Sequence, residues 1–213
     1  MRGRAFVFSI LSIVLAILAA GCTVGSGDMI TEARDVNGFN EIVLMTSGDV
    51  VVEVTGTESL EIEADDNVIS LLTSEVVNGR LELGSSGSFS TTRGITYTIT
   101  AAELVGVTIS GSGDIDVSRI DADSFEARIT GSGNIDPSGN SANLEVTISG
   151  SGRFSGEDLE SAIGDVIVSG SGEAVVNVTD DLMVRITGSG DVRYMGDPTI
   201  DQDISGSGGV SQR

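Results

Sequence analysis

The 213-residue chain has no histidine, no lysine and no tryptophan, and it contains one cysteine and two prolines. Without histidine, a Ser-His-Asp or Cys-His catalytic system and an imidazole metal ligand are excluded. The single cysteine, Cys22, excludes an intrachain disulfide and a thiolate metal site. These absences predict a protein with no catalytic residues of these kinds, no metal site and no cofactor.

Positive charge is also scarce. The chain has 32 acidic and 11 basic residues, all of them arginine, so its formal net charge is −21. Such a charge argues against nucleic-acid binding, because contacts with phosphates dominate that affinity. A solvated, repulsive surface that limits the aggregation of exposed β edges is sufficient to explain the acidity.

The N-terminus has the pattern of a bacterial export signal. Arg2 and Arg4 precede an uncharged stretch, Ala5–Ala20, and Leu18-Ala19-Ala20-Gly21-Cys22 follows the order of a lipobox. The segment resembles the signal of bacterial lipoproteins, which is cleaved before the cysteine that receives the acyl chains. A plain transmembrane anchor or an uncleaved core helix is the alternative, although the run of 16 residues is shorter than the ~20 that a span needs.

We therefore predict that residues 1–21 are a lipoprotein signal peptide and that Cys22 is the site of lipid attachment. Residues 22–33, which are rich in Gly, Ser, Thr and acids, are expected to be a tether between lipid and domain. In Gram-negative lipoproteins, a residue other than Asp after the cysteine, here Thr23, usually directs the protein to the outer membrane. The resemblance thus implies an envelope protein that contacts the membrane through its anchor.

Glycine, by contrast, is abundant, with 29 residues, and much of it lies in a repeat. The triplet Gly-Ser-Gly, preceded by Ser or Thr, occurs six times at intervals of 18 to 20 residues. Near-identical quartets at so regular a spacing indicate a repeat architecture. The twelve glycines of the triplets are Gly111, Gly113, Gly131, Gly133, Gly150, Gly152, Gly170, Gly172, Gly188, Gly190, Gly206 and Gly208.

Apolar and polar residues alternate on both sides of each quartet, as in Val107-x-Ile109 and Ile115-x-Val117. A period of two predicts strands with one buried face. A chain that returns to the same place about every 19 residues stacks each strand on its copy in the next coil, which gives a parallel β-helix. The variable third segment of each repeat, which contains Pro137, is expected to be a loop side.

The triplets have a sufficient structural explanation. Glycine adopts the positive φ that a tight corner needs and has no Cβ to collide with the neighbouring coil. The Ser and Thr hydroxyls are expected to form a hydrogen-bonded ladder along this corner. A calcium-binding β-roll is disfavoured, because its repeat has nine residues and Arg153 occupies one position after a triplet. A phosphate-binding loop would need a Lys and a helix N-terminus.

Residues 34–106 are less regular but also β-patterned. Strands are expected at 40–45, 49–54, 60–64 and 95–99, and Asn78-Gly79 predicts a hairpin within 76–83. We predict one β domain over residues 34–213, with repeat coils from about residue 104 and N-terminal strands that cap one end. No cap is visible at the C-terminus, so end-to-end association with another subunit is possible.

The chain resembles the putative auto-transporter adhesin, head GIN domain family. The likeness lies in Gly38-Phe39-x-x-Ile42, Gly48-Asp49-Val50, Gly79-x-Leu81 and, above all, the Ser/Thr-Gly-Ser-Gly-Asp/Asn repeats, and it covers nearly all of the exported chain. It implies an all-β fold built on a right-handed parallel β-helix. It also implies an adhesin-like cell-envelope protein, often lipid-anchored, and it assigns no catalytic residues.

Carboxylate pairs are the remaining candidates for catalysis. Asp65-Asp66, Asp114-x-Asp116, Asp121-x-Asp123 and Asp180-Asp181 each place two acids close in sequence, and glycosidases need two carboxylates about 5–10 Å apart. Such pairs also arise by chance among 32 acids. The leading hypothesis is a lipid-anchored, non-catalytic structural or interaction module with a protein or glycan partner. A glycan-active enzyme on the same scaffold and a periplasmic envelope-sensing accessory protein are the alternatives.

Overall fold

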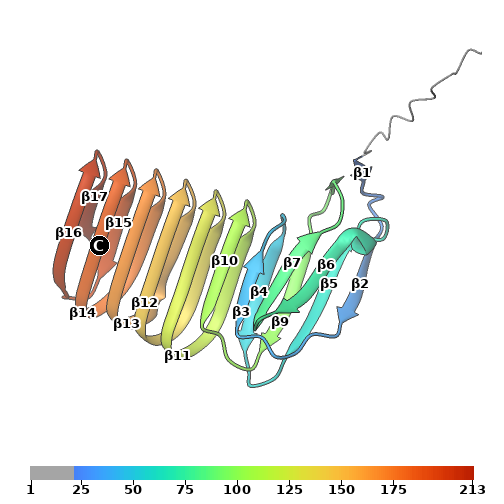
Figure 1. The fold of residues 1–213 in the computed structure, drawn as a ribbon, viewed down its shortest axis with the longest axis horizontal. Coiled ribbons are helices and arrows are strands. Elements are labelled where there is room, and N and C mark those ends of the chain that lie inside the picture. Colours follow the sequence, from blue (N-terminus) through green and yellow to red (C-terminus); the bar gives the residue numbers. More distant parts are fainter. Residues whose placement is uncertain (1–21) are drawn as a thin grey trace, which may run out of the picture.

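The computed structural model describes residues 22–213, so the predicted signal peptide lies outside the described residues. The strands stack into an elongated solenoid, with the N-terminal elements at one end and the last coil at the other (Figure 1). The one helical element in this part of the chain is η1 (Ile69–Leu71), a single 3₁₀ turn. Residues 22–213 contain no helix that is long and apolar enough to cross a membrane.

The Gly-Ser-Gly repeats form the regular part of the solenoid. Neighbouring coils pair in parallel and in register at the corners, where Gly111 lies beside Gly131 and Gly131 beside Gly150. The predicted all-β parallel β-helix is thereby confirmed. Its strands are β10 (Gly106–Gly111), β11 (Asp114–Gly131), β12 (Asn134–Gly150), β13 (Arg153–Gly170), β14 (Glu173–Gly188), β15 (Asp191–Met195), β16 (Thr199–Gly206) and β17 (Gly209–Gln212).

The core consists of apolar rows that run along the solenoid, with one residue from each coil. Val107, Ala127, Val146, Val166 and Val184 are consecutive partners in one such row, and each is at most 2% exposed. Buried apolar area contributes about 25 cal/mol per Å². Because each coil contacts only its neighbours, the stability is approximately a sum over the interfaces between coils.

The third segment of each repeat is not the loop side that we predicted. Strands β11, β12 and β13 each continue through it for 17 or 18 residues and bend at shifts of register. Pro137 is buried, opposite Val117, and the register between β12 and β13 shifts between Ile135 and Ser138. Proline has no N–H to donate to a ladder, so it is accommodated where the ladder is already interrupted.

The N-terminal region extends the stack and then ends it. Strands β3 (Glu41–Leu44), β4 (Asp49–Val54) and β9 (Thr96–Ala101) continue the parallel pairing. Strands β2 (Met29–Arg34), β5 (Ser59–Asp65) and β6 (Leu72–Val77) are paired antiparallel with their neighbours, β6 with β7 (Arg80–Ser85). The hairpin turn has φ of 52° at Asn78 and 81° at Gly79, as the Asn-Gly pair predicts.

The segment that we expected to be a tether, residues 22–33, is largely part of the folded domain. Strand β1 (Thr23–Val24) pairs in parallel with β8 (Phe89–Ser90), and β2 pairs with β5 along its whole length. A Gly/Ser-rich composition suggests a free linker, but here its backbone groups find strand partners. The tether prediction is therefore wrong for the described residues 23–33.

The last coil carries polar residues at core positions. Gln202 lies beside Val184, and Gln212 lies beside Tyr194, in rows that are apolar in the preceding coils. The Gln212 side chain donates a hydrogen bond to the Gly196 carbonyl (2.8 Å). These amides form a partial C-terminal cap that the sequence pattern did not reveal. The same coil still places Ile200, Ile204 and Val210 at core positions.

Candidate functional site

The Gly-Ser-Gly corners stack into a continuous column. Gly170 has a φ of +122°, and a Cβ added there would lie 2.5 Å from the Gly150 carbonyl oxygen. The third residue of the triplet is equally restricted, since a Cβ at Gly152 would lie 2.5 Å from the Gly133 oxygen. Eleven of the twelve glycines therefore serve the close approach of successive coils, and Gly111 is the exception, with its nearest atom at 3.5 Å.

The ladder at the corner is formed by the backbone. The amide of Ser151 donates to the Gly131 carbonyl (2.9 Å), and Ser171 donates to Gly150 (2.8 Å). Within residues 22–213, no quartet hydroxyl makes a side-chain hydrogen bond, so the predicted hydroxyl ladder is not formed. The residue before each triplet and the middle serine are exposed in all six copies, which leaves two rows of hydroxyls facing solvent.

The corner column continues into the N-terminal region. The Thr46 carbonyl oxygen is 3.5 Å from a Cβ built at Gly111, and Met45 donates to the Leu83 carbonyl (2.8 Å). Figure 1 shows this side as the line of arrow tips that ends at β1 and β8. We call this side the corner ridge, defined as residues 22–27, 45–48, 84–92 and the six quartets 110–113, 130–133, 149–152, 169–172, 187–190 and 205–208.

The Asp65-Asp66 pair holds the chain that follows Cys22. Asp65 is fully buried and accepts a hydrogen bond from the Gly27 amide (2.6 Å), and Asp66 accepts one from the Ser26 hydroxyl (2.6 Å). A Cβ at Gly25 would overlap the Asp65 carboxylate. Cys22 itself is an exposed free thiol. These two aspartates thus have a structural role at the N-terminus.

Asp114 and Asp116 lie on the outer face of the parallel sheet. Asp114 accepts hydrogen bonds from the Asn134 amide (3.2 Å) and side chain (2.7 Å). Burial raises the pKa of the Asp116 carboxyl, and the carboxylates of Asp136, Asp114 and Asp49 raise that pKa further. Asp116 and Asp136 line a groove of about 700 Å³ together with Arg213.

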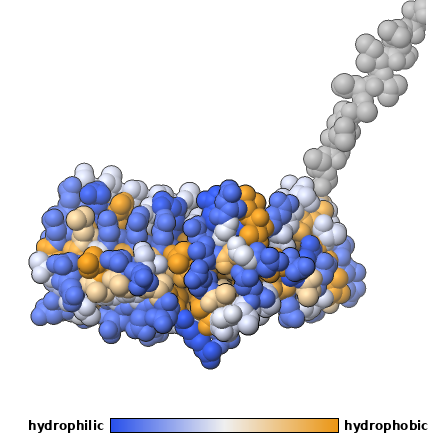
Figure 2. Space-filling view, turned by 60° about the horizontal axis from the view of Figure 1, so that its bottom comes forward, coloured by the Kyte–Doolittle hydropathy of each residue, from blue (hydrophilic) through white to orange (hydrophobic). Residues whose placement is uncertain are grey.

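Asp121 and Asp123 lie on the edge opposite the corner ridge. They line a groove of about 950 Å³, in which every charged lining residue of the described chain is acidic. Asp180 and Asp181 are exposed farther along the same edge. Hydrophilic residues predominate in Figure 2, in which the bottom of Figure 1 is turned forward. We call this the acidic edge, defined as Asp121, Asp123, Asp158, Glu160, Asp180 and Asp181.

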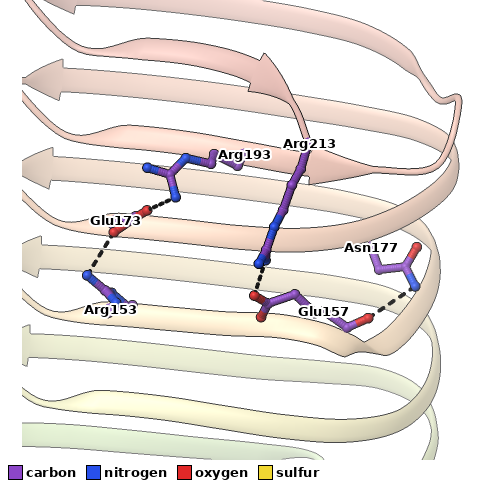
Figure 3. Close-up of polar contacts among 6 residues, drawn as sticks. All are labelled: Arg153, Glu157, Glu173, Asn177, Arg193 and Arg213. Atoms are coloured by element: carbon purple, nitrogen blue, oxygen red, sulfur yellow. Dashed lines mark hydrogen bonds and ion pairs between the residues drawn. The ribbon is translucent and has the colours of Figure 1, made fainter.

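A chain of ion pairs crosses the last coils. Glu173 contacts Arg153 (2.9 Å) and Arg193 (2.6 Å), one on each neighbouring coil (Figure 3). Arg213 pairs with Glu157, whose carbonyl accepts from the Asn177 side chain (3.3 Å). Exposed pairs of this kind contribute about 0–1 kcal/mol each. The sequence pattern missed the Arg213 contact, since 56 residues separate the partners and no motif marks them.

The four carboxylate pairs lie in three places: Asp65-Asp66 at the N-terminus, Asp114-x-Asp116 on the outer face of the sheet, and the other two pairs on the acidic edge. Among the described residues, no group of three or more Cys, Asp or Glu side chains has the arrangement of a metal site. The groove of about 950 Å³ carries carboxylates without an Arg among its described lining residues, so it offers charge of one sign and little means to bind an anionic sugar. The geometry suits a surface that contacts another body.

Comparison with solved structures gives the same fold. A putative adhesin from Bacteroides fragilis is 22% identical with a TM-score of 0.74, and the match covers 89% of this chain and 99% of that one. A putative lipid binding protein from Parabacteroides distasonis is 22% identical with a TM-score of 0.61, over 91% of this chain and 100% of that one. A putative adhesin from Parabacteroides merdae is 20% identical with a TM-score of 0.60, over 90% and 98%.

No curated protein matches the chain by sequence. The model of one protein family does, and its match spans residues 38–198. This range includes five of the six quartets, the degenerate corner at Gly48 and the Asn78-Gly79 hairpin, so it rests on the same features from which the resemblance was inferred. The chain therefore belongs to the family described as putative auto-transporter adhesin, head GIN domain.

Proposed function

We propose that the protein is a lipid-anchored, adhesin-like module of the bacterial cell envelope that binds a protein or glycan partner and catalyses no reaction. Its family and its structural neighbours are named as adhesins or a lipid binding protein. The observation that carries the proposal is the surface itself. Ordered rows of exposed hydroxyls and charges lie on a rigid solenoid, and the carboxylate pairs do not converge on one centre.

The non-catalytic role is supported by the distribution of acids. An active site needs a nucleophile or an acid-base pair around one place where a reacting atom sits. Here Asp65 is committed to a backbone amide, Asp114 to Asn134, and Asp180 to the hydroxyl of Thr179 (2.9 Å). These contacts explain the candidate carboxylates without a substrate.

The lipid anchor is supported by the lipobox and by the state of Cys22. The thiol is exposed and unpaired in a chain with no other cysteine, so attachment of acyl chains would leave the fold unchanged. Several acyl chains hold a protein far more firmly than one, since each buried CH₂ contributes about 0.8 kcal/mol. Thr23 after the cysteine favours the outer membrane.

Protease treatment of intact cells tests the adhesin role. We expect the domain of intact cells to be accessible to proteinase K and to be captured with a specific envelope or host partner by pull-down. Lysed cells treated in parallel serve as the control, because a tightly paired solenoid resists proteolysis even when it is accessible. A domain that is cleaved in lysed cells but protected in intact cells would contradict a role at the cell surface.

A further inference from the structure

We propose that the domain lies lengthwise on the membrane that holds its anchor, with the corner ridge against the lipid headgroups and the acidic edge facing away. This inference rests on the proposed lipid attachment at Cys22 and adds an orientation to it. The partner of the ridge is a phospholipid surface. Three features of the structure support this orientation, namely the fixed position of Cys22, the absence of charge along the ridge and the charge on the opposite edge.

Cys22 has almost no freedom relative to the domain. Gly25 donates to the Ser90 carbonyl (2.8 Å), Ser26 donates to the Asn67 side chain (3.0 Å), and Asn67 donates back to the Val24 carbonyl (2.8 Å). Together with the Asp65 and Asp66 contacts, these bonds hold the backbone from Val24 to Gly27. An anchor at Cys22 therefore brings the N-terminal end of the ridge directly to the bilayer.

The corner ridge has no charged residue among its defined segments, in a chain of which 20% is charged. The fold does not require an uncharged residue at every ridge position. The middle serines of the triplets, such as Ser132 and Ser171, are exposed and make no side-chain hydrogen bond within the described chain, so Asp or Glu would be sterically acceptable there. Exposed Val24 and Met45, at 66% and 48%, add apolar contacts near the anchor.

The charge lies elsewhere on the molecule. A row of charged residues of both signs lies directly beside the ridge on one flank, namely Asp49, Asp114, Arg153, Glu173 and Asp191. Asp28 and Asp66 are the acids at the anchored end, and Asp66 is bound to the Ser26 hydroxyl. The acidic edge is separated from the ridge by the extended strand 124–131, whose seven residue-to-residue steps span about 23 Å.

This arrangement keeps the carboxylates of the acidic edge away from the headgroups. Electrostatic interactions are screened over about 8 Å at physiological ionic strength, so acids about 23 Å from the bilayer experience little repulsion from anionic lipids. A domain lying on the acidic edge would bring six carboxylates against that surface. Contact through the ridge therefore keeps the six carboxylates of the acidic edge away from the lipid.

The two orientations differ in the thickness of the protein layer. The sheet β17-β15-β14-β13-β12-β11-β4-β9-β5-β2 contains ten strands, and nine intervals of about 4.8 Å give a long axis of about 43 Å. A domain lying on the ridge extends by about 23 Å, the length of the strands. Neutron reflectometry on a supported bilayer resolves this difference.

The experiment uses residues 22–213 coupled through Cys22, the sole cysteine, to a maleimide lipid in a bilayer of phosphatidylcholine and anionic phosphatidylglycerol. We expect a layer of about 25–30 Å including side chains, which is about two-thirds of the upright value of about 43 Å. The double variant Ser132→Glu, Ser171→Glu places charge on the ridge and should thicken the layer. The matched control Ser124→Glu, Asn140→Glu adds the same charge at the opposite edge and should leave the thickness unchanged.

Circular dichroism and thermal unfolding establish that both variants are folded. A wild-type layer of about 43 Å or more, or the same thickness in the ridge and control variants, would overturn the proposal. Because the coupling is chemical, the result does not depend on whether the cell acylates Cys22. A failure of lipid attachment in cells would therefore contradict the proposed function alone, while an upright layer would contradict the orientation alone.

Discussion

Glycine at the corner is required by contact between coils, and this requirement differs from one glycine to another. We expect Gly170→Ala to lower the free energy of unfolding by about 2 kcal/mol or more, since it combines a positive φ with a clash against the Gly150 carbonyl. Gly87→Ala is the control, because its Cβ would meet only the Leu71 side chain at 3.7 Å. Denaturant unfolding of both variants measures the difference, and equal effects would contradict the corner geometry.

Position 25 needs a glycine because a Cβ there would overlap the Asp65 carboxylate, and not because of the backbone conformation of Gly25. We expect Gly25→Ala to release residues 23–28 from the domain while the solenoid remains folded, because an added Cβ overlaps Asp65. Hydrogen exchange should show loss of protection at the Gly25 and Gly27 amides, with little change at the Ser151 and Ser171 amides. Unchanged protection of residues 23–28 would mean that the segment is held by other contacts.

The phenol of Tyr97 is buried without a hydrogen-bond partner within the described chain. Desolvation accordingly raises its pKa, and the nearby Arg34 charge lowers it by less. We expect Tyr97→Phe to leave the free energy of unfolding unchanged or to raise it by up to about 1 kcal/mol, since it removes an unsatisfied polar group and keeps the ring. A loss of stability on thermal unfolding would indicate that the hydroxyl is bonded.

Asp116 makes stability depend on pH. Its folded pKa is raised above the ordinary value of 3.8, so the folded state binds the proton more tightly and the free energy of unfolding falls as pH rises through this range. We expect Asp116→Asn to raise the melting temperature at pH 7, by an amount equivalent to about 0.5 kcal/mol or less for an exposed side chain. At pH 3 the difference should disappear. Asp123→Asn is the control, and an equal effect from it at pH 7 would contradict the role of the Asp49, Asp114 and Asp136 cluster.

At the scale of elements, the regular strands were predictable because two signals coincide. The alternation around each quartet gives the buried face, and the spacing of the glycines gives the register, so Val107, Ala127 and Val146 could be placed in one row before the fold was known. The bend after Val117 was not predictable in the same way. A shift of register depends on how neighbouring coils pair. Pro137 does not predict such a shift, because a proline is compatible with a loop as well as with an interrupted ladder.

The partial C-terminal cap could not be predicted from the sequence, because a single glutamine in a strand does not show whether its position faces the core. Only the register of β16 on β14 shows that Gln202 occupies the position of Val184. We expect Gln202→Val to promote end-to-end association, because it restores an apolar row at an unpaired edge. Sedimentation velocity over a range of concentrations should show a larger species than the wild type. Thr199→Val, at an outward position of the same strand, serves as the control, and identical sedimentation of Gln202→Val and wild type would contradict the capping role.

At the scale of the whole molecule, the fold followed from the repeat, but the position of Cys22 relative to the domain did not. The contacts of Ser26 and Gly27 with Asp65 and Asp66 join residues about 40 positions apart, and composition alone described that segment as a linker. The carboxylate pairs show the same limit. Closeness in sequence did not indicate that Asp65-Asp66 lies at the N-terminus, that Asp114-x-Asp116 lies on the outer face of the sheet, or that the other two pairs lie on one acidic edge. The net charge of −21 likewise acquires meaning only from its distribution between the ridge and the acidic edge.

The central claim is that this solenoid is carried on the membrane by Cys22, and the mass of its N-terminal tryptic peptide tests it most directly. After Arg4, the next site for trypsin is Arg34. The account predicts that the native protein yields a peptide of residues 22–34 with acyl chains on Cys22, and that Cys22→Ala abolishes this product. An unmodified peptide of residues 5–34 from the native protein would contradict the account.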